Sequence, residues 1–221
     1  STVYSIFMRY ADFNDDGYPD FCSFSSGYDR DGTTGDYPVV LMSGPDGVYT
    51  DLRYTDFNNG YFHGGTTGDF DNDGDIDILF WDMWKQGANL GKNSLYLEND
   101  GKGNFTKKEA KDLIDWSDFI STLPANAMLS YMDMEVTDLN NDGYNDLIML
   151  CIDYPGDGTG AVAEKYGYVT PPIVFWGSSS GKFGGSNYSL LPPPRNGYGI
   201  SSTFCFYDFN GDGRKELIVE K

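Results

Sequence analysis

The chain of 221 residues is strongly acidic, with 34 Asp and Glu against 15 Lys and Arg and a formal net charge of −19. An acidic excess of this size disfavours nucleic acids and anionic membrane surfaces as partners, because both would repel the protein. Aromatic residues make up 16% of the chain and glycines number 28, which favours turn-rich β structure around a core. Since no stretch approaches the roughly 18 apolar residues of a membrane span, we expect a soluble protein as given.

The first predicted strand, 5–10, leads into an acidic loop with the pattern Asp-x-(Asp/Asn)-x-Asp-Gly-x-x-(Asp/Glu). This loop pattern occurs four times, and each copy runs into an apolar stretch typical of a strand. The loops are 12–20, 69–77, 138–146 and 208–216, with starting points 57, 69 and 70 residues apart. A regular period of this length indicates one supersecondary unit per repeat.

Each unit has the same order of predicted elements. The strands that enter the loops are 5–10, 61–64, 129–136 and 203–207, and the strands that leave them are 20–24, 77–81, 146–150 and 216–220. Three hairpins follow, at 39–49, 94–105 and 173–183, with turns rich in Gly, Asp, Asn and Ser. The leaving strands are nearly continuous in apolar residues, which predicts burial on both faces. Four strands per unit are typical of a β-propeller blade.

These loops and hairpins resemble the FG-GAP and VCBS repeat family, the calcium-binding β-propellers found in integrin α-subunits, and the resemblance covers nearly the whole chain. In that family the acidic loop joins the innermost strand of a blade to the next strand and binds Ca²⁺. The resemblance therefore implies an all-β propeller with four-stranded blades. We expect one domain over 1–221, with blades at 1–57, 58–126 and 127–196 and an incomplete blade at 197–221.

The incomplete fourth blade is unusual, because closed propellers have about 4–8 blades. A half-blade leaves an open strand edge that invites pairing with another chain. We expect either a fragment of a longer propeller or a chain completed by a partner or a second copy, with a stand-alone assembly as a third alternative.

The loops carry the ligands that a hard cation needs: side-chain oxygens at loop positions 1, 3, 5 and 9, Gly at position 6 and a main-chain carbonyl at position 7. An EF-hand would need an acid at position 12 and flanking helices, and neither is present. The predicted side-chain ligands are Asp12, Asn14, Asp16 and Asp20; Asp69, Asp71, Asp73 and Asp77; Asp138, Asn140, Asp142 and Asp146; and Asp208, Asn210, Asp212 and Glu216. The predicted carbonyl ligands are Tyr18, Asp75, Tyr144 and Arg214.

The predicted cofactor is thus up to four structural Ca²⁺ ions, which would bring the net charge to about −11. The alternative is an acidic turn whose Asp side chains cap the backbone without metal. We expect the fourth site to be the weakest, because Glu216 reaches further than Asp and because Arg214 and Lys215 oppose a cation. Extracellular Ca²⁺ modules bind at about 10⁻⁴–10⁻³ M, so the sequence predicts an extracellular or cell-surface location.

The variable loops 25–37, 82–93 and 153–170 share one position in the repeat, so a propeller would gather them opposite the acidic loops. Aromatic and polar side chains there suit a glycan or a protein surface; the alternative is that they only pack the loops onto the scaffold. The candidate ligand-binding residues are Tyr28, Arg30, Trp84, Gln86, Tyr154, Tyr166 and Tyr168. The segment 107–119 is predicted as a short amphipathic helix, either a lid or a connector.

The sequence favours binding over catalysis. His63 is the single histidine, which excludes a zinc site of several histidines, and Cys22 and Cys205 are predicted as buried, unreactive thiols. The leading hypothesis is a Ca²⁺-stabilised recognition or adhesion module for glycan or extracellular protein. The alternatives are the propeller part of a carbohydrate-active enzyme, a polysaccharide lyase or hydrolase whose paired carboxylates hide among the many acids, and a structural assembly module.

Overall fold

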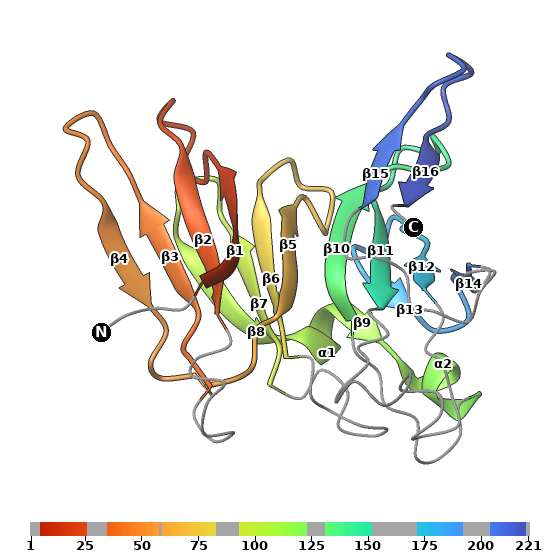
Figure 1. The fold of residues 1–221 in the computed structure, drawn as a ribbon, viewed down its shortest axis with the longest axis horizontal. Helices are drawn as coiled ribbons and strands as arrows, with labels where there is room; N and C mark the ends of the chain where they lie inside the picture. Colours follow the sequence, from red (N-terminus) through yellow and green to blue (C-terminus); the bar gives the residue numbers. More distant parts are fainter. Residues whose placement is uncertain are drawn as a thin grey trace, which may run out of the picture.

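The computed structural model describes residues 5–25, 35–57, 59–82, 93–122, 131–151, 172–191 and 204–219. Nearly all of their regular structure is β, and the strands follow one another as antiparallel units that stand side by side in an open row (Figure 1). The described strands do not close into a ring. The predicted all-β class and the four-stranded unit are confirmed.

Three units are four-stranded blades in which each strand is antiparallel to the next. Blade 1 contains β1 (Ser5–Ala11), β2 (Asp20–Ser25), β3 (Val39–Met42) and β4 (Thr50–Arg53). Blade 2 contains β5 (Gly64–Gly68), β6 (Asp77–Trp81), β7 (Leu95–Asn99) and β8 (Phe105–Glu109). Blade 3 contains β10 (Tyr131–Thr137), β11 (Asp146–Cys151), β12 (Ile173–Phe175) and β14 (Tyr188–Leu190). The described part of blade 4 is the hairpin of β15 (Phe204–Tyr207) and β16 (Glu216–Val219).

The core lies between blades, because alternate residues of each second strand face opposite neighbours. In blade 2, Ile78 belongs to a cluster shared with blade 1, whereas Leu79 belongs to a cluster shared with blade 3. Blade 3 follows the same rule, with Leu147 facing blade 2 and Ile148 in a third cluster with Phe206 of blade 4. We call the two sides of a blade its preceding face and its following face.

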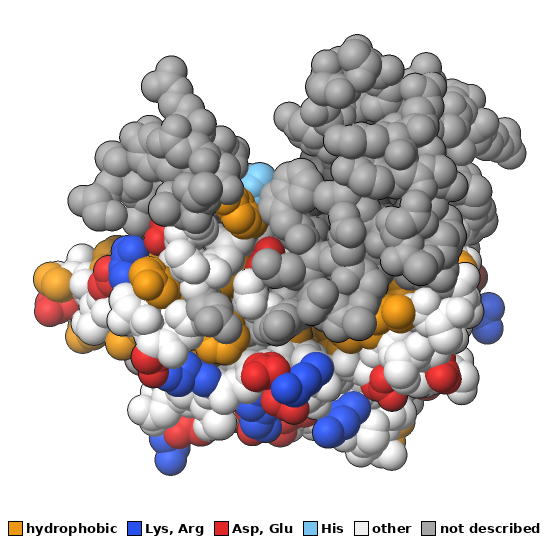
Figure 2. Space-filling view, turned by 90° about the horizontal axis from the view of Figure 1, so that it is seen from below, with side chains coloured by type: hydrophobic (Ala, Val, Ile, Leu, Met, Phe, Trp, Pro, Cys, Tyr) orange, Lys and Arg blue, Asp and Glu red, His pale blue; other side chains and the backbone are white. Residues whose placement is uncertain are grey.

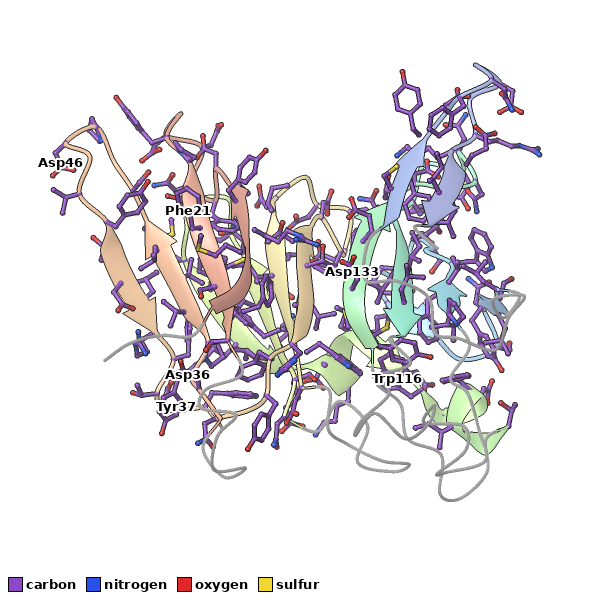
Figure 3. All side chains as sticks on the ribbon, in the orientation of Figure 1. Phe21, Asp36, Tyr37, Asp46, Trp116 and Asp133 are labelled. Carbon is purple, nitrogen blue, oxygen red and sulfur yellow. The ribbon has the colours of Figure 1, made fainter. Side chains whose placement is uncertain are left out.

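Small residues let the inner strands approach one another closely. A Cβ on Gly65, which has φ +150°, would lie 2.0 Å from the ring of Phe24 in blade 1, so only glycine fits there. Gly65 also pairs with Asp133 in a parallel bridge that joins β5 to β10. Asp133, labelled in Figure 3, forms an ion pair with Arg9 of β1, with 3.2 Å between the guanidinium nitrogen and Oδ1. The inner strands of three blades thus meet at one place.

The segment after β8 differs from the predicted helix over 107–119. It forms α1 (Ala110–Leu113), β9 (Ile114–Asp115) and α2 (Ser117–Ser121). The single-helix prediction was wrong because Ile114 is extended, with φ −123° and ψ 119°, and Ile114–Asp115 pairs with Phe183–Gly184 as a strand, which interrupts the helix.

Two other predictions need correction. The predicted third hairpin ends at Phe183, but β13 (Phe183–Gly184) pairs in parallel with β9, and β14 supplies the fourth strand of blade 3. The strand predicted over 61–64 instead begins at Gly64 as β5. The first of these differences arises because the inserted segment 110–121 offers a strand partner that the repeat pattern does not contain.

The two cysteines with described side chains behave differently. Cys22 is buried, and its burial raises the pKa of the thiol to about 12. Cys205 is exposed, so the prediction that it is buried was wrong, because its side of β15 carries no neighbouring blade among the described residues. No helix within those residues is long and apolar enough to cross a membrane.

Candidate metal centre

The four acidic loops join the first and second strands of their blades and lie along the same side of the row, the upper side in Figure 1. The second loop shows their common internal structure. Both carboxylate oxygens of Asp69 accept main-chain hydrogen bonds, from Asp73 at 3.1 Å and from Gly74 at 3.0 Å. Asp73 in turn accepts a 2.9 Å bond from the N–H of Asp75. The acids at positions 1 and 5 therefore hold the loop in a fixed turn.

The same three hydrogen bonds occur in the other three loops. Their position 1 acids are Asp12, Asp138 and Asp208, and their position 5 acids are Asp16, Asp142 and Asp212. The four sequence repeats are thus four copies of one local geometry.

Backbone conformation explains a position that the sequence pattern left undefined. Residues at position 4 have positive φ: +64° at Asn72, with Asp15, Asn141 and Gly211 in the same region. Asn, Asp and Gly are the residue types that tolerate this left-handed conformation. The glycine at position 6 is also left-handed, with φ +96° at Gly74. Sequence reasoning missed position 4, although its restriction to these three residue types was a visible signal.

The acid at position 9 is buried and connects the loop to its own blade. Asp77 accepts hydrogen bonds from the N–H of Phe70 at 3.3 Å, the N–H of Asn99 at 2.8 Å and the hydroxyl of Tyr96 at 2.9 Å. Burial raises the pKa of Asp77 to about 7, although these donors oppose the shift. Asp20 and Asp146 are buried in the same way. Asp20 accepts hydrogen bonds from the N–H groups of Phe13 and Ser43. Asp146 accepts them from the N–H groups of Leu139 and Gly177.

The second loop brings three carboxylates together. One oxygen from each of Asp69, Asp71 and Asp73 lies within 4.8 Å of the others, a separation that one cation could bridge. Burial, together with the charge of Asp73, raises the pKa of Asp71. Loops 1, 3 and 4 have Asn at position 3, so loop 2 carries the densest negative charge.

The oxygen at position 3 supports a cation in two loops. The Oδ1 atoms of Asp71 and Asn14 are buried and have no hydrogen-bond partner among the described residues. Since buried polar oxygens are nearly always paired, these two fit a bound cation, and hard Ca²⁺ suits such oxygen donors. When bound, the ion would neutralise the position 1, 3 and 5 acids, and the chain's own residues would hold it.

Each of the first two loops is covered by the hairpin turn of the next blade. Gly181, in the turn between β12 and β13, lies against Asp71: a Cβ there would be 3.0 Å from the Asp71 Cβ. Gly103, in the turn between β7 and β8, lies against Asn14 in the same way, with a Cβ distance of 3.2 Å. Position 3 of the loop therefore lies at the junction of two blades.

Side-chain amides reinforce both junctions. Asn99 Nδ2 donates to the carbonyls of Phe13 at 2.7 Å and Ile76 at 3.0 Å, which joins loops 1 and 2. Asn145 Nδ2 donates to the carbonyl of Asp69 at 2.8 Å, which joins loops 3 and 2. The loops are thus structural parts of the interface between blades.

The fourth loop differs from the other three in the hydrogen-bond partners of its position 9 acid. Glu216 accepts from the N–H of Phe209 at 2.8 Å and from Asn210 Nδ2 at 2.9 Å. The amine of Lys215 donates to Thr137 Oγ1 of β10. Lys215 therefore opposes a cation less than expected, because its charge is directed to blade 3.

The candidate ligand-binding residues Tyr28, Arg30, Trp84, Gln86, Tyr154, Tyr166 and Tyr168 lie outside the described residues. The molecule seen from below shows Lys and Arg side chains interspersed with Asp and Glu on its described surface (Figure 2). Three lysines of β8 and α1, Lys107, Lys108 and Lys111, form ion pairs with Asp56, Glu98 and Glu109 respectively. The ammonium groups of these three lysines are therefore paired with carboxylates.

Stacked four-stranded blades with an acidic loop between their first two strands define a protein of the β-propeller repeat class. The model of the FG-GAP-like repeat matches residues 69–149 and 138–219. The chain therefore belongs to the FG-GAP-like repeat family, and the predicted resemblance is confirmed. None of the curated proteins matches the sequence significantly. Repeats of this family indicate a recognition or adhesion module of propeller type.

Proposed function

We propose that this protein is an extracellular or surface-displayed recognition module whose blades are held together by Ca²⁺. The observation that carries the proposal is the orphaned position 3 oxygen of Asp71 beside Asp69 and Asp73, covered by Gly181 of the next blade. A cation at this place would neutralise the loop and at the same time stabilise the junction of two blades. The ligands are those predicted from the sequence, at positions 1, 3, 5, 7 and 9 of each loop.

The role of position 9 follows from its contacts. Asp77 already accepts three hydrogen bonds, so it contributes to a metal site mainly by fixing the loop against β7. The densest set of acids makes loop 2 the tightest site. Loops of this kind that bind at about 10⁻⁴–10⁻³ M fill outside cells and remain empty in cytosol, which is the reason for assigning an extracellular location.

Recognition belongs to the side of the blades opposite the acidic loops. We assign it to glycan or extracellular protein, bound through Tyr28, Arg30, Trp84, Gln86, Tyr154, Tyr166 and Tyr168. Aromatic faces beside amides and charges give rigid contact area with hydrogen-bonding edges. The blade boundaries 1–57, 58–126, 127–196 and 197–221 are part of the same proposal, since each of the first three blades places one variable loop on that side.

Two measurements test the proposal. Calorimetric titration with Ca²⁺ should detect saturable binding, and a glycan array together with a panel of extracellular proteins should detect a ligand.

Trp84→Ala and Tyr166→Ala should each weaken ligand binding at least about tenfold, as expected for aromatic anchors, without lowering the melting temperature. Tyr49→Ala, in the turn between β3 and β4, is the control and should bind normally. Undetectable Ca²⁺ binding would refute the metal assignment, and equal binding by all variants would refute the ligand face.

A further inference from the structure

Two exposed asparagines lie in the sequence pattern of an N-glycosylation acceptor. The pattern is Asn-x-Ser/Thr, and the chain has it at Asn104-Phe105-Thr106 and Asn187-Tyr188-Ser189. Such tripeptides also occur by chance, so their place in the fold decides what they can do. Both asparagines are exposed, and each stands immediately before the outermost strand of its blade, β8 in blade 2 and β14 in blade 3.

Both side-chain amides can be modified without loss of the hydrogen bonds they make. Asn187 Nδ2 donates to the carbonyl of Trp176 at 3.0 Å, and Asn104 Nδ2 donates to Asp100 Oδ2 at 2.9 Å. An amide nitrogen carries two protons, and each of these bonds uses one of them. In N-glycosylation, Nδ2 forms a bond to the anomeric carbon of a lipid-diphosphate-linked oligosaccharide, the bond from that carbon to the diphosphate breaks, and one Nδ2 proton leaves with the lipid diphosphate. The remaining N–H can keep the hydrogen bond.

The outer edge of β14 lacks the charges that the outer strands of the other two four-stranded blades carry. The strand β4 contains Asp51 and Arg53, and β8 contains Lys107, Lys108 and Glu109, whereas β14 has the uncharged sequence Tyr-Ser-Leu. Within the described part of the chain, no strand pairs with the outer edge of β14. Charged side chains discourage another strand from adding to such an edge, so β14 needs a different form of protection.

Both acceptors lie on the side of the blades that carries the acidic loops. Phe105, next to Asn104, pairs with Asn99, whose N–H donates to the position 9 acid of loop 2. The N–H of Trp176 donates to the carbonyl of Asn187 at 3.1 Å, and the next residue, Gly177, donates to the position 9 acid of loop 3. Glycans attached here are therefore remote from the opposite side of the blades, to which recognition is assigned.

We propose that Asn104 and Asn187 carry N-linked glycans and that the glycan on Asn187 covers the uncharged outer edge of β14. A glycan is bulky and hydrophilic, so it keeps another strand from adding there. The glycan on Asn104 lies beside a strand that is already charged, so it has less to protect. The inference rests on the extracellular location in the proposed function, because this modification belongs to secreted proteins.

Expression of the whole chain behind a signal peptide in cultured eukaryotic cells tests the modification. Loss of the signal peptide identifies the molecules that have entered the secretory pathway, and peptide mass spectrometry measures the glycan at each asparagine of those molecules. Asn104→Gln and Asn187→Gln should each lose one glycan. Ser189→Ala should also lose the Asn187 glycan, whereas Ser189→Thr should keep it, because either hydroxyl completes the acceptor.

Light scattering on warming tests the protection of β14. Asn187→Gln and Ser189→Ala should aggregate sooner than the chain without substitutions, whereas Asn104→Gln and Ser189→Thr should not. Ser186→Ala is the matched control, because Ser186 is exposed beside Asn187 but outside the acceptor pattern. Leu190 is 46% exposed on β14, so Leu190→Lys added to Asn187→Gln should restore solubility by placing a charge on the same strand.

The remaining outcomes overturn the proposal in part or in whole. An asparagine without glycan, in molecules that have lost the signal peptide, would remove that site. Equal aggregation after loss of either glycan, or no aggregation after loss of the Asn187 glycan, would contradict the role of β14. Calorimetric titration with Ca²⁺ separates this proposal from the proposed function. A glycosylated chain that binds no Ca²⁺ would overturn the proposed metal site alone, and a chain that binds Ca²⁺ but carries no glycan would overturn this inference alone.

Discussion

The side chain of Asn145 donates a 2.8 Å hydrogen bond to the main-chain carbonyl of Asp69, the first residue of the neighbouring acidic loop. The N–H of Asn145 also donates to Asn72 Oδ1 of that loop at 3.0 Å. Loop 2 is therefore fixed by blade 3 as well as by its own blade. A cation bound within the loop would act on the interface between the blades, so metal binding and blade packing should be measured together.

Removal of metal should destabilise the folded chain. Each site that binds only the folded state adds about 2.7 kcal/mol when free Ca²⁺ is about 100 times its dissociation constant. Excess chelator should therefore lower the melting temperature, and readdition of Ca²⁺ should restore it, as followed by scanning calorimetry. Mg²⁺ is the control ion, because its strict octahedral geometry suits the loop less well. An unchanged melting temperature in chelator would exclude a structural role for Ca²⁺.

Asp71→Asn should change stability in opposite directions with and without metal. Asp71 lies beside Asp69 and Asp73, and burial and the Asp73 charge raise its pKa. The neutral amide removes this repulsion, so the variant should melt higher than the unmodified chain in chelator. In Ca²⁺ it should gain less stability, because loop 2 then resembles the three loops with Asn at position 3. Asp118→Asn, at an exposed acid of α2, is the control and should change neither value; a uniform shift in both conditions would argue against a metal site.

Gly181 and Gly185 allow a matched test of the blade junction. Both have positive φ, +62° and +56°, so alanine at either should cost about 1 kcal/mol in backbone strain. An added Cβ meets nothing within 4 Å at Gly185 but lies 3.0 Å from the Asp71 Cβ at Gly181. Gly181→Ala should therefore cost more stability and also weaken Ca²⁺ binding, as measured by calorimetric titration. Equal losses in the two variants would mean that the hairpin turn does not support the loop.

The loops and the strands that leave them could be predicted from the sequence because their signals are local. Asp77 follows a turn defined by Gly74, and Ile78 and Leu79 mark burial on both faces of one strand. The pairing of β9 with β13 could not be predicted, because it joins segments that are far apart in the sequence and carry no repeat. The triple hydrogen bonding of Asp77 also depends on Asn99 and Tyr96, which the loop pattern does not include.

Asp77→Ala should destabilise the chain even without metal. The substitution leaves the N–H groups of Phe70 and Asn99 and the hydroxyl of Tyr96 without an acceptor in a buried place. Each unpaired buried donor costs about 1–3 kcal/mol, so urea titration in chelator should show a loss of at least about 3 kcal/mol in the free energy of unfolding. Asp118→Ala, at an exposed acid, should cost far less. A small loss in Asp77→Ala would show that solvent replaces these bonds and that position 9 serves the metal alone.

Glu135→Gln should remove part of the pH dependence of stability. Glu135 lies on β10 two residues from Asp133, and burial raises its pKa although the charges of Arg9 and Lys215 oppose the shift. A carboxyl whose pKa is higher in the folded state than in the unfolded chain binds its proton more tightly when folded. Stability is then greatest below the ordinary pKa of Glu and falls as pH rises through the raised value.

The glutamine variant carries no charge at any pH, so its melting temperature should exceed that of the unmodified chain at pH 7 and converge with it near the ordinary Glu pKa of about 4.3. Melting curves in chelator across this range measure the difference, and chelator is needed because metal binding adds its own pH dependence. Asp118→Asn is the control and should track the unmodified chain throughout. If Glu135→Gln instead lowered the melting temperature at pH 7, the attraction of Arg9 and Lys215 would outweigh the cost of burying the Glu135 carboxylate.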